Sequence, residues 1–204
     1  MCTDCINSLE LVDPACVCPQ CNALTGNNML CGRCLQTPFA FSALYSAYFY
    51  NSMAKYLLWQ LKFYHQLAFL PQLGTLFLER IKAYVSEEPP EVLVPVPLYR
   101  WRLFTRGFNQ AHELARYIGK GMQLKVDPFL IEKIKATKAQ ALLSTKARQH
   151  NLQGSFKVKA GQLPQSVLLI DDVFTTGATV NALAQALIQR GVARVRVATL
   201  FRAC

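Results

Sequence analysis

The chain has 204 residues, of which 52% are hydrophobic, and this composition excludes a disordered protein and allows one ordinary domain beside a small one. Its 22 basic and 12 acidic residues give a formal charge of +10, which favours an anionic partner such as nucleic acid or a phosphorylated ligand. The N-terminus does not resemble a signal peptide, and no stretch approaches the ~20 apolar residues of a membrane helix. We therefore expect a cytoplasmic protein without membrane insertion.

Cysteines crowd the start of the chain, where seven of the eight lie within the first 34 residues. Cys18 and Cys21 form one Cys-x-x-Cys pair, and Cys31 and Cys34 form another nine residues further on. Two such pairs supply the four thiolates of a closed tetrahedral zinc site, so we expect a structural zinc ion here. A redox role is the alternative for any single pair.

A third pair, Cys2 and Cys5, is harder to interpret. It could ligate a second ion, or it could be half of a site lost from a shorter N-terminus, while Cys16 fits neither pattern. Residues 1–37 contain too few apolar residues for a core of their own, so a metal would hold this zinc-ribbon unit together. Pro38 marks the predicted boundary with a larger domain over residues 38–204.

The larger domain opens with an aromatic segment. Residues 39–50 favour one or two strands, and two helices are predicted over residues 51–63 and 67–85. The aromatic side chains could form a base-stacking platform, but the periodicity favours a place in the core.

Next comes a predicted buried strand over residues 92–97, followed by Arg100, Arg102 and Arg106. No acid occurs from Val92 to His112, so these arginines could receive a phosphate or pyrophosphate. The alternative is a solvated basic loop. A helix is predicted from Ala111 onward.

A second acid-free stretch runs from Lys133 to Ile170. Short strands are expected over residues 129–134 and 155–158. The segment between them, residues 136–153, lacks a firm periodicity and is interpreted as a hood or binding loop. The stretch carries seven basic residues, namely Lys133, Lys135, Lys138, Lys146, Arg148, Lys157 and Lys159.

The segment from Val167 to Val180 is the centre of the prediction. Four apolar residues predict a strand covered on both faces, and Asp171 and Asp172 follow at its expected carboxyl end. A polar loop and a helix come next, which is the arrangement that places ligands at the edge of an α/β sheet. A last strand is predicted from Arg194 to Phe201.

The loop residues suit a sugar phosphate. Hydroxyls of Thr175, Thr176 and Thr179, backbone N–H groups and the helix N-terminus can meet a phosphate, while Gly177 and Ala178 allow close approach. The two carboxylates would repel a phosphate and are better matched to the hydroxyls of a ribose. A ribose 5-phosphate satisfies both halves. The alternative is a strand end followed by a capped helix.

This segment resembles the phosphoribosyl pyrophosphate (PRPP) motif of type I phosphoribosyltransferases. The resemblance implies that the acids hold the ribose hydroxyls and that the threonine and glycine loop holds the 5-phosphate. The expected PRPP-binding residues are Asp171, Asp172, Val173, Thr175, Thr176, Gly177, Ala178 and Thr179, with Arg100 and Arg106 from the arginine segment.

Further motifs narrow the resemblance to the ComF family of competence and DNA-utilisation proteins. They are, in chain order, the cysteine pairs, Gln60-Leu61-Lys62-Phe63, Val94-Pro95-Val96-Pro97-Leu98, Arg106-Gly107-Phe108-Asn109-Gln110-Ala111, Gln140 with Arg148 and Asn151, and the acid pair. The family implies a phosphoribosyltransferase-like fold behind a zinc ribbon and a role in DNA uptake or use. The first cysteine pair of the family pattern is not found here.

We thus expect an α/β fold with a mainly parallel sheet flanked by helices, which binds PRPP with Mg²⁺ and single-stranded DNA. The candidate DNA-binding residues are Arg102, Lys135, Lys138, Lys146 and Arg148. Three functions stay open: a DNA-handling protein that binds PRPP, an active phosphoribosyltransferase with an unknown acceptor, and a zinc-ribbon scaffold for DNA-uptake or helicase proteins.

Overall fold

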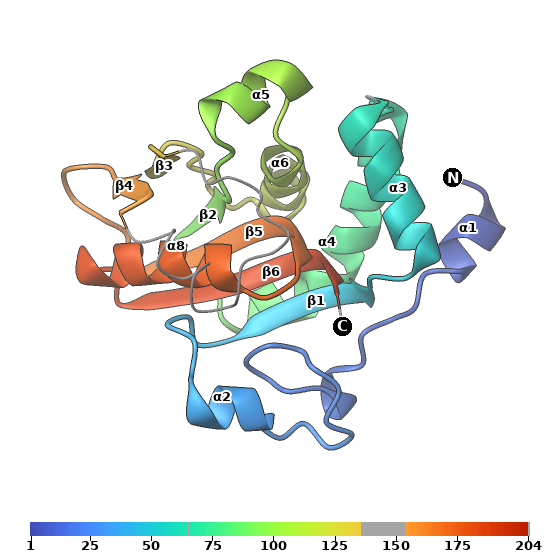
Figure 1. The fold of residues 1–204 in the computed structure, drawn as a ribbon, viewed down its shortest axis with the longest axis horizontal. Helices are drawn as coiled ribbons and strands as arrows, with labels where there is room; N and C mark the ends of the chain where they lie inside the picture. The colour runs from blue at the N-terminus through green and yellow to red at the C-terminus, as the bar shows by residue number, and fades with distance from the viewer. Residues whose placement is uncertain (65, 136–153, 204) are drawn as a thin grey trace.

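The computed structural model describes residues 1–64, 66–135 and 154–203, and its centre is a four-stranded sheet (Figure 1). The strands follow the order β1-β6-β5-β2, and every neighbouring pair is parallel. This arrangement confirms the predicted α/β fold with a mainly parallel sheet. The strands are Leu44–Phe49 (β1), Arg194–Arg202 (β6), Ser166–Phe174 (β5) and Val92–Pro95 (β2).

The apolar run that opens β5 is buried on both faces of the sheet. Val167, Leu168, Leu169 and Ile170 are each no more than 1% exposed. Because side chains alternate along a strand, Leu168 and Ile170 join one core cluster, and Val167 and Leu169 join the other. A continuous apolar run is what a parallel strand covered on both sides requires.

Three long helices cover one face of the sheet. Asparagine caps begin two of them, since the Asn51 side chain accepts a hydrogen bond from the Ala54 N–H and the Asn109 side chain accepts one from the Ala111 N–H, each at 3.0 Å. Nowhere in the described ranges is a helix both long and apolar enough to cross a membrane. The three helices are α3 (Ser52–Phe63), α4 (Leu70–Glu87) and α6 (Gln110–Met122).

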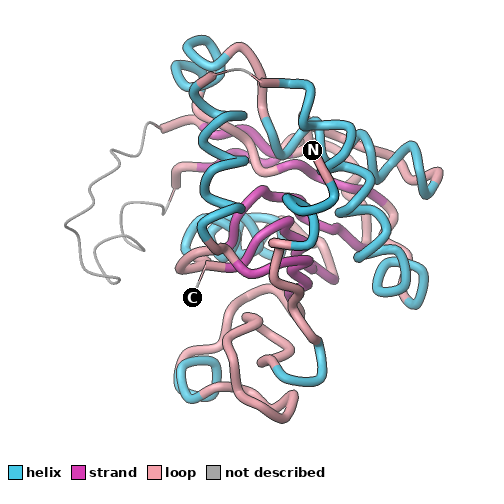
Figure 2. Tube along the Cα trace, turned by 90° about the vertical axis from the view of Figure 1, so that its right-hand side faces the viewer, coloured by secondary structure: helices cyan, strands magenta, loops and turns pink. Residues whose placement is uncertain are grey.

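The opposite face is covered by α8 (Ala178–Gln189) and by the N-terminal segment with α2 (Gly32–Gln36). Figure 2 shows this segment as a loop-rich lobe below the sheet. Cys18, Cys21 and Cys34 nevertheless belong to the same buried cluster as the side chains of β5 that face them. The lobe therefore packs on the core of the sheet, and the boundary at Pro38 stays a prediction.

Short elements complete the described chain. Two of them, β3 and β4, form an antiparallel pair apart from the main sheet. The others lie in connections between the layers. The short elements are α1 (Thr3–Asn7), 3₁₀ turns at Pro14–Cys16 and Leu67–Phe69, α5 (Arg100–Arg106), β3 (Ile131–Lys133) and β4 (Phe156–Val158). The predicted hood over residues 136–153 lies outside the described residues.

Some predicted boundaries differ from the structure. Within the segment predicted as one or two strands, residues 39–50, the structure has a single strand, which begins at Leu44. The helix predicted over residues 67–85 is a 3₁₀ turn followed by α4. The strand predicted up to Pro97 ends as β2 at Pro95. The Val96 N–H still donates to the Ile170 carbonyl at 2.8 Å, and the pairing with β5 ends there.

No helix was predicted for the arginine segment, where a solvated basic loop was the alternative to a phosphate-binding site. Residues 100–106 form α5, which Gly107 ends in the left-handed conformation with a φ of 74°. None of the seven residues of α5 is buried, so the helix has no apolar face whose periodicity the sequence could reveal.

The acid pair was predicted at the carboxyl end of its strand, but it lies inside β5. Pairing with β6 continues past the acids, from Asp171 opposite Thr199 to Phe174 opposite Arg202. On the other side β2 stops opposite Ile170. The acids therefore lie where the sheet is paired on one side only, so the side toward β2 is left free for side chains from other elements.

Candidate functional site

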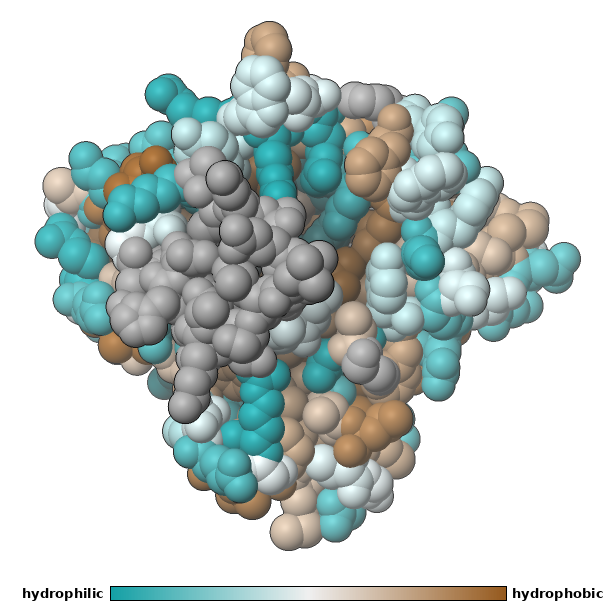
Figure 3. Space-filling view, in the orientation of Figure 1, coloured by the Kyte–Doolittle hydropathy of each residue, from teal (hydrophilic) through white to brown (hydrophobic). Residues whose placement is uncertain are grey.

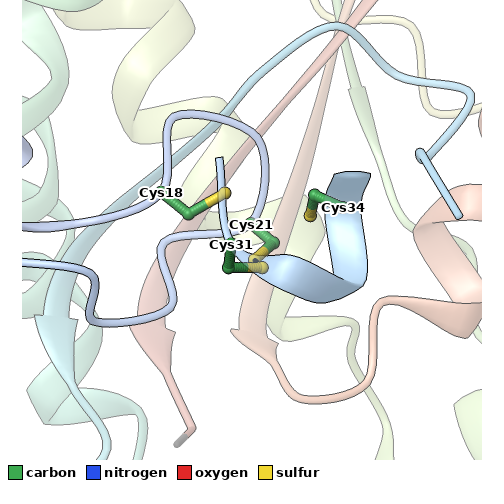
Figure 4. Close-up of side chains that lie close together, drawn as sticks. All are labelled: Cys18, Cys21, Cys31 and Cys34. Carbon is green, nitrogen blue, oxygen red and sulfur yellow. Dashed lines mark hydrogen bonds between the residues drawn. The ribbon is translucent and has the colours of Figure 1, made fainter. Parts of the chain in front are cut away.

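Four cysteine thiols of the N-terminal segment gather around α2, as Figure 4 shows. Cys18 and Cys21 come from a loop, Cys31 immediately precedes α2, and Cys34 lies within it. Their sulfur atoms all lie within 4.8 Å of one another, and three of the four residues are buried. This four-cysteine cluster confirms that the two predicted pairs meet, and it could hold a metal ion.

The chemistry of the four-cysteine cluster fits a soft cation such as zinc. Burial raises the pKa of the Cys31 thiol, but hydrogen bonds from the Cys34 backbone and from neighbouring thiols outweigh burial and bring this pKa down to about 7. Burial and the adjacent thiols of Cys21 and Cys31 raise the pKa of Cys34. A bound cation favours the thiolate form of every ligand, so zinc would lower the raised thiol pKa values and displace the thiol protons.

The remaining N-terminal cysteines lie apart from the four-cysteine cluster. The sulfur atoms of Cys2 and Cys5 are 3.2 Å apart at α1, which Figure 1 places away from α2. Within the part of the chain that the structure describes, no third metal-ligating side chain groups with this pair. Cys16 donates to the Asp13 carboxylate at 3.6 Å, as expected for a bystander. A metal site at Cys2 and Cys5 stays a prediction.

The two carboxylates of β5 lie in different surroundings. Asp172 is 9% exposed and Asp171 is partly exposed. Burial, together with the neighbouring Asp172 carboxylate, raises the pKa of Asp171 to about 8, although the Asp172 N–H donates to the Asp171 carboxylate at 2.9 Å. Two acids held this close disfavour double ionisation, so the pair is suited to partners that bring hydrogen-bond donors or positive charge.

A lysine from α3 contacts the acid pair. The Lys62 ammonium lies 2.5 Å from the Asp172 carboxylate, and the side chains are only 24% and 13% exposed. Sequence reasoning assigned no role to Lys62, although the residue belongs to one of the quoted motifs. A signal was present, because Lys62 follows the buried Leu58 by four residues and therefore points from the same side of the helix.

The loop after the acids exposes its backbone. Gly177 has a φ of 74°, and a Cβ on it would lie 2.5 Å from the Phe174 ring and 2.8 Å from the Phe39 ring. The loop and the first turn of α8 surround a small hollow of about 50 Å³. As far as the chain is described, the N–H groups of Thr176 and Gly177 donate to no protein acceptor. Free amides at a helix N-terminus are suited to bind an anion.

α5 and β3 bring positive charge toward the acids. Burial lowers the pKa of Arg106, the Asp172 carboxylate opposes this shift, and Arg102 adds to it. Burial and Arg102 likewise lower the pKa of Lys133, and the Asp171 carboxylate opposes the shift. The structure thus brings the predicted Arg102 and Arg106 to the same edge of the sheet as the acids.

A large cavity of about 630 Å³ opens between α5, α6 and β3. Two basic and two acidic side chains line it, Arg100, Lys133, Glu113 and Glu132, and Phe108, Phe129 and Ile131 contribute apolar surface. In Figure 3, α5 forms the top of this face of the molecule. Arg100 therefore borders this cavity, whereas Arg106 lies nearer the acid pair.

The candidate DNA-binding residues are described only in part. Arg102 and Lys135 are exposed, while Lys138, Lys146 and Arg148 lie outside the described residues. Two exposed aromatic residues that sequence reasoning missed, Trp101 and Phe104, lie on α5 with ring centroids 6.1 Å apart. Their exposed fractions are 65% and 82%.

The aromatic segment over residues 39–50 lies mainly in the core, as its periodicity indicated. Phe41 is completely buried, and Tyr48 is 4% exposed. Phe39 and Phe41 stack with ring centroids 4.8 Å apart, and both contact Phe174 edge to face. These rings support the strand end from behind and are not available for base stacking.

Comparison with known proteins agrees with this geometry. Residues 103–203 match the phosphoribosyl transferase domain family, so the chain contains a domain of that class. The DNA utilization protein YhgH of Escherichia coli strain K12 is 32% identical over 190 residues, which are 91% of this chain and 84% of that protein. The chain therefore belongs to the ComF family.

Two further likenesses are more distant. Competence protein F of Haemophilus influenzae is 31% identical over 179 residues, which cover 85% of this chain and 78% of that protein. Among solved structures, the purine phosphoribosyltransferase from Pyrococcus horikoshii is 17% identical, with 65% of this chain and 82% of that chain covered and a TM-score of 0.37.

Proposed function

We propose that the chain binds PRPP, or a ribose phosphate like it, where β5 passes into α8. The observation that carries this proposal is the direct succession of an acid pair and a loop with free N–H groups along one strand-to-helix connection. Carboxylates accept hydrogen bonds from neighbouring hydroxyls, and loop amides donate to a phosphate. A ribose 5-phosphate presents both groups on one molecule.

The roles follow from this division. The acids would hold the ribose hydroxyls, the loop would hold the 5-phosphate, and the arginines of α5 would meet the pyrophosphate. The oxygen donors of the acid pair fit Mg²⁺, which supplies charge neutralisation of the pyrophosphate when bound. The proposed PRPP-binding residues are Asp171, Asp172, Val173, Thr175, Thr176, Gly177, Ala178, Thr179, Arg100 and Arg106.

Calorimetry with magnesium and PRPP tests this proposal. The double change Asp171→Asn with Asp172→Asn should weaken binding at least about tenfold, because it removes charge-assisted hydrogen bonds to the ribose. Asp4→Asn is the matched control, since Asp4 is exposed at α1 and should bind as the wild type does. Unchanged affinity of the double variant would refute the ribose role.

We also propose that the four-cysteine cluster holds a structural zinc ion. Cys18→Ser should lose the metal and yield poorly soluble protein, because the N-terminal segment has little apolar material apart from the thiols themselves. Cys16→Ser should keep the metal, since Cys16 lies outside the cluster. Metal analysis of freshly purified, reduced wild-type protein that finds no zinc would rule the proposal out.

We further propose that the chain takes part in DNA uptake or utilisation and binds single-stranded DNA directly. The printed names of the relatives from Escherichia coli and Haemophilus influenzae support the role. The formal charge of +10 supports an anionic partner. The exposed rings of α5, which lie between arginines along the chain, supply the combination of stacking surfaces and charge that single strands require.

In this proposal bases stack on Trp101 and Phe104, while basic side chains contact the phosphates. Binding should depend only weakly on sequence, because point charges on phosphates read no base edges. The proposed phosphate contacts are Arg102, Lys135, Lys138, Lys146 and Arg148.

Two variants separate these contributions. Changing Lys135, Lys138 and Lys146 to Glu should flatten the log–log salt dependence, since each lost phosphate contact removes about 0.7 from the slope. Trp101→Ala should cost about 1–3 kcal/mol of binding free energy at an almost unchanged slope. Arg190→Glu, at an exposed position beyond α8, controls for a charge reversal elsewhere on the surface. If neither change affects DNA affinity beyond the control, direct DNA binding is refuted.

An active phosphoribosyltransferase is the second candidate, and the cavity of about 630 Å³ favours it. A mixed apolar and charged cavity of this size, which Arg100 of the proposed PRPP site also lines, has room for an acceptor molecule. The test is release of pyrophosphate from PRPP in the presence of candidate acceptors. Phe129 lies in the cavity wall. If the wild type shows turnover and Phe129→Ala abolishes it, the enzyme is favoured over a binding protein.

A further inference from the structure

Two arginines connect the four-cysteine cluster with the loop after β5. Arg33 lies between Cys31 and Cys34, and its guanidinium donates to the Thr176 carbonyl at 2.8 Å. Arg202, at the end of β6, donates through Nε to the Cys21 carbonyl at 2.7 Å. The Nη1 of Arg202 donates to the Thr175 carbonyl at a longer 3.4 Å.

These contacts determine where the loop amides point. In a trans peptide the carbonyl of one residue and the N–H of the next point in opposite directions. A guanidinium that holds the Thr176 carbonyl therefore turns the Gly177 N–H to the other side, and the contact with the Thr175 carbonyl does the same for the Thr176 N–H. Neither of these two N–H groups donates to an acceptor within the described residues.

The arginines are themselves held in place. The Arg33 guanidinium lies 5.0 Å from the centre of the Phe39 ring, and that of Arg202 lies 5.1 Å from the centre of the Phe174 ring. The Asn181 side chain of α8 accepts a hydrogen bond from the Ala40 N–H at 2.7 Å. The chain just after the cysteine knuckles is thus tied to the helix that follows the loop.

We propose that Arg33 and Arg202 are positioning residues through which the four-cysteine cluster sets the phosphate-binding geometry of the loop at residues 175–177. This inference rests on the proposed binding of a ribose phosphate. It goes beyond that proposal because the cysteine knuckles, rather than the sheet alone, orient the loop amides. A metal ion bound by the cysteines would fix the knuckle that carries Arg33, so loss of the metal should weaken phosphate binding.

Arg33→Met is the test variant, because Arg33 is exposed and its loss should leave the fold intact. Two probes are titrated by calorimetry, ribose 5-phosphate for the loop and magnesium pyrophosphate for the arginines of α5. We expect about three- to tenfold weaker binding of ribose 5-phosphate and no change in pyrophosphate binding. The difference should shrink at high salt, because the Arg33 charge is exposed to solvent. Arg190→Met, which removes another exposed arginine, should change neither probe.

The metal is tested on the full-length chain with a chelator. Chelation should weaken ribose 5-phosphate binding of the wild type by a similar factor and add little in Arg33→Met, because both changes remove one interaction. The inference is overturned if Arg33→Met binds ribose 5-phosphate as tightly as the wild type does. It is also overturned if the variant loses affinity for both probes in parallel, or if chelation weakens the variant as much as it weakens the wild type. If the wild type binds neither ribose 5-phosphate nor PRPP, the proposed function itself fails.

Discussion

The β5–α8 connection has two halves with opposite electrostatic surroundings, the acid half (Asp171 and Asp172) and the loop half (residues 175–177). The acid half concentrates negative charge, and the structure answers it with cations from distant parts of the chain, most directly Lys62. The loop half carries no charged side chain and keeps its N–H groups free, and its supporting cations lie behind it on the carbonyl side. The cations thus contact the carboxylates of the acid half but the backbone carbonyls of the loop half, as the proposed ribose and phosphate roles of the two halves would require.

This difference also separates what each half needs for stability. The acid half needs partners that offset the cost of burying two carboxylates that repel each other. Its side chains can therefore be substituted without loss of stability if the charge stays balanced. The loop half depends on backbone conformation, so a single added atom can disrupt it. Three predictions follow from this contrast, and the largest effect is expected in the loop.

Gly177→Ala should reduce the free energy of unfolding by about 3 kcal/mol and abolish phosphate binding. The added Cβ would lie 2.5 Å from the Phe174 ring and 2.8 Å from the Phe39 ring, and the φ of 74° is itself unfavourable for alanine. Denaturant unfolding measures the loss. Gly191→Ala is the matched control, because Gly191 has a φ of 102° and open space around it, so about 1 kcal/mol is expected. Equal losses at the two glycines would contradict a crowded loop.

Lys62→Met should cost about 1–2 kcal/mol, because it leaves the Asp172 carboxylate without its ion-pair partner in a largely buried place. It should also raise the pKa of Asp171 further, since the Lys62 charge lowers that pKa in the wild type. Thermal unfolding and an NMR titration of the carboxyl group measure the two effects. Lys55→Met, at an exposed position of the same helix, should be nearly neutral. A Lys62 variant as stable as this control would show that the ion pair contributes nothing.

Asp171→Asn should stabilise the protein by on the order of 1 kcal/mol near neutral pH, less than the ~4 kcal/mol that the pKa difference alone would give there, because the side chain is partly exposed and water screens its charge. The pKa of Asp171 is about 8 in the folded protein and 3.8 ordinarily, so between these values the folded state holds a proton that the unfolded state releases. The wild type therefore loses stability as pH rises from about 4 to about 8, at most about 1.4 kcal/mol per pH unit from this group. Asparagine does not titrate, so the advantage of the variant should widen over this window. A constant difference between about pH 6 and about pH 8 would disprove the raised pKa.

The features that the sequence predicted are local. The strand, acid pair, threonine loop and helix are consecutive, and each cysteine pair occupies four residues, so spacing alone indicates their chemistry. Arg33 and Arg202 were missed as partners of the site because tertiary packing alone brings them to it, whereas Lys62 was missed although its helical spacing from Leu58 offered a signal. α5 was not predicted as a helix because it buries no residue, and β5 was predicted too short because its extension depends on pairing with β6.

The order of the strands has a consequence for how the chain reaches its native state. β6 lies inside the sheet, between β1 and β5, yet it is the last strand of the described chain, and Leu44 of β1 is paired with Val197 of β6. Contacts of such long sequence separation form slowly, and parallel pairing must wait until both strands have been synthesised. The hydrogen bond from Arg202 to the Cys21 carbonyl joins residues that are still further apart in the sequence. During translation the cysteine knuckles therefore emerge before β6, with which their packing is completed, so a metal ion captured early would protect the thiols against oxidation and aggregation.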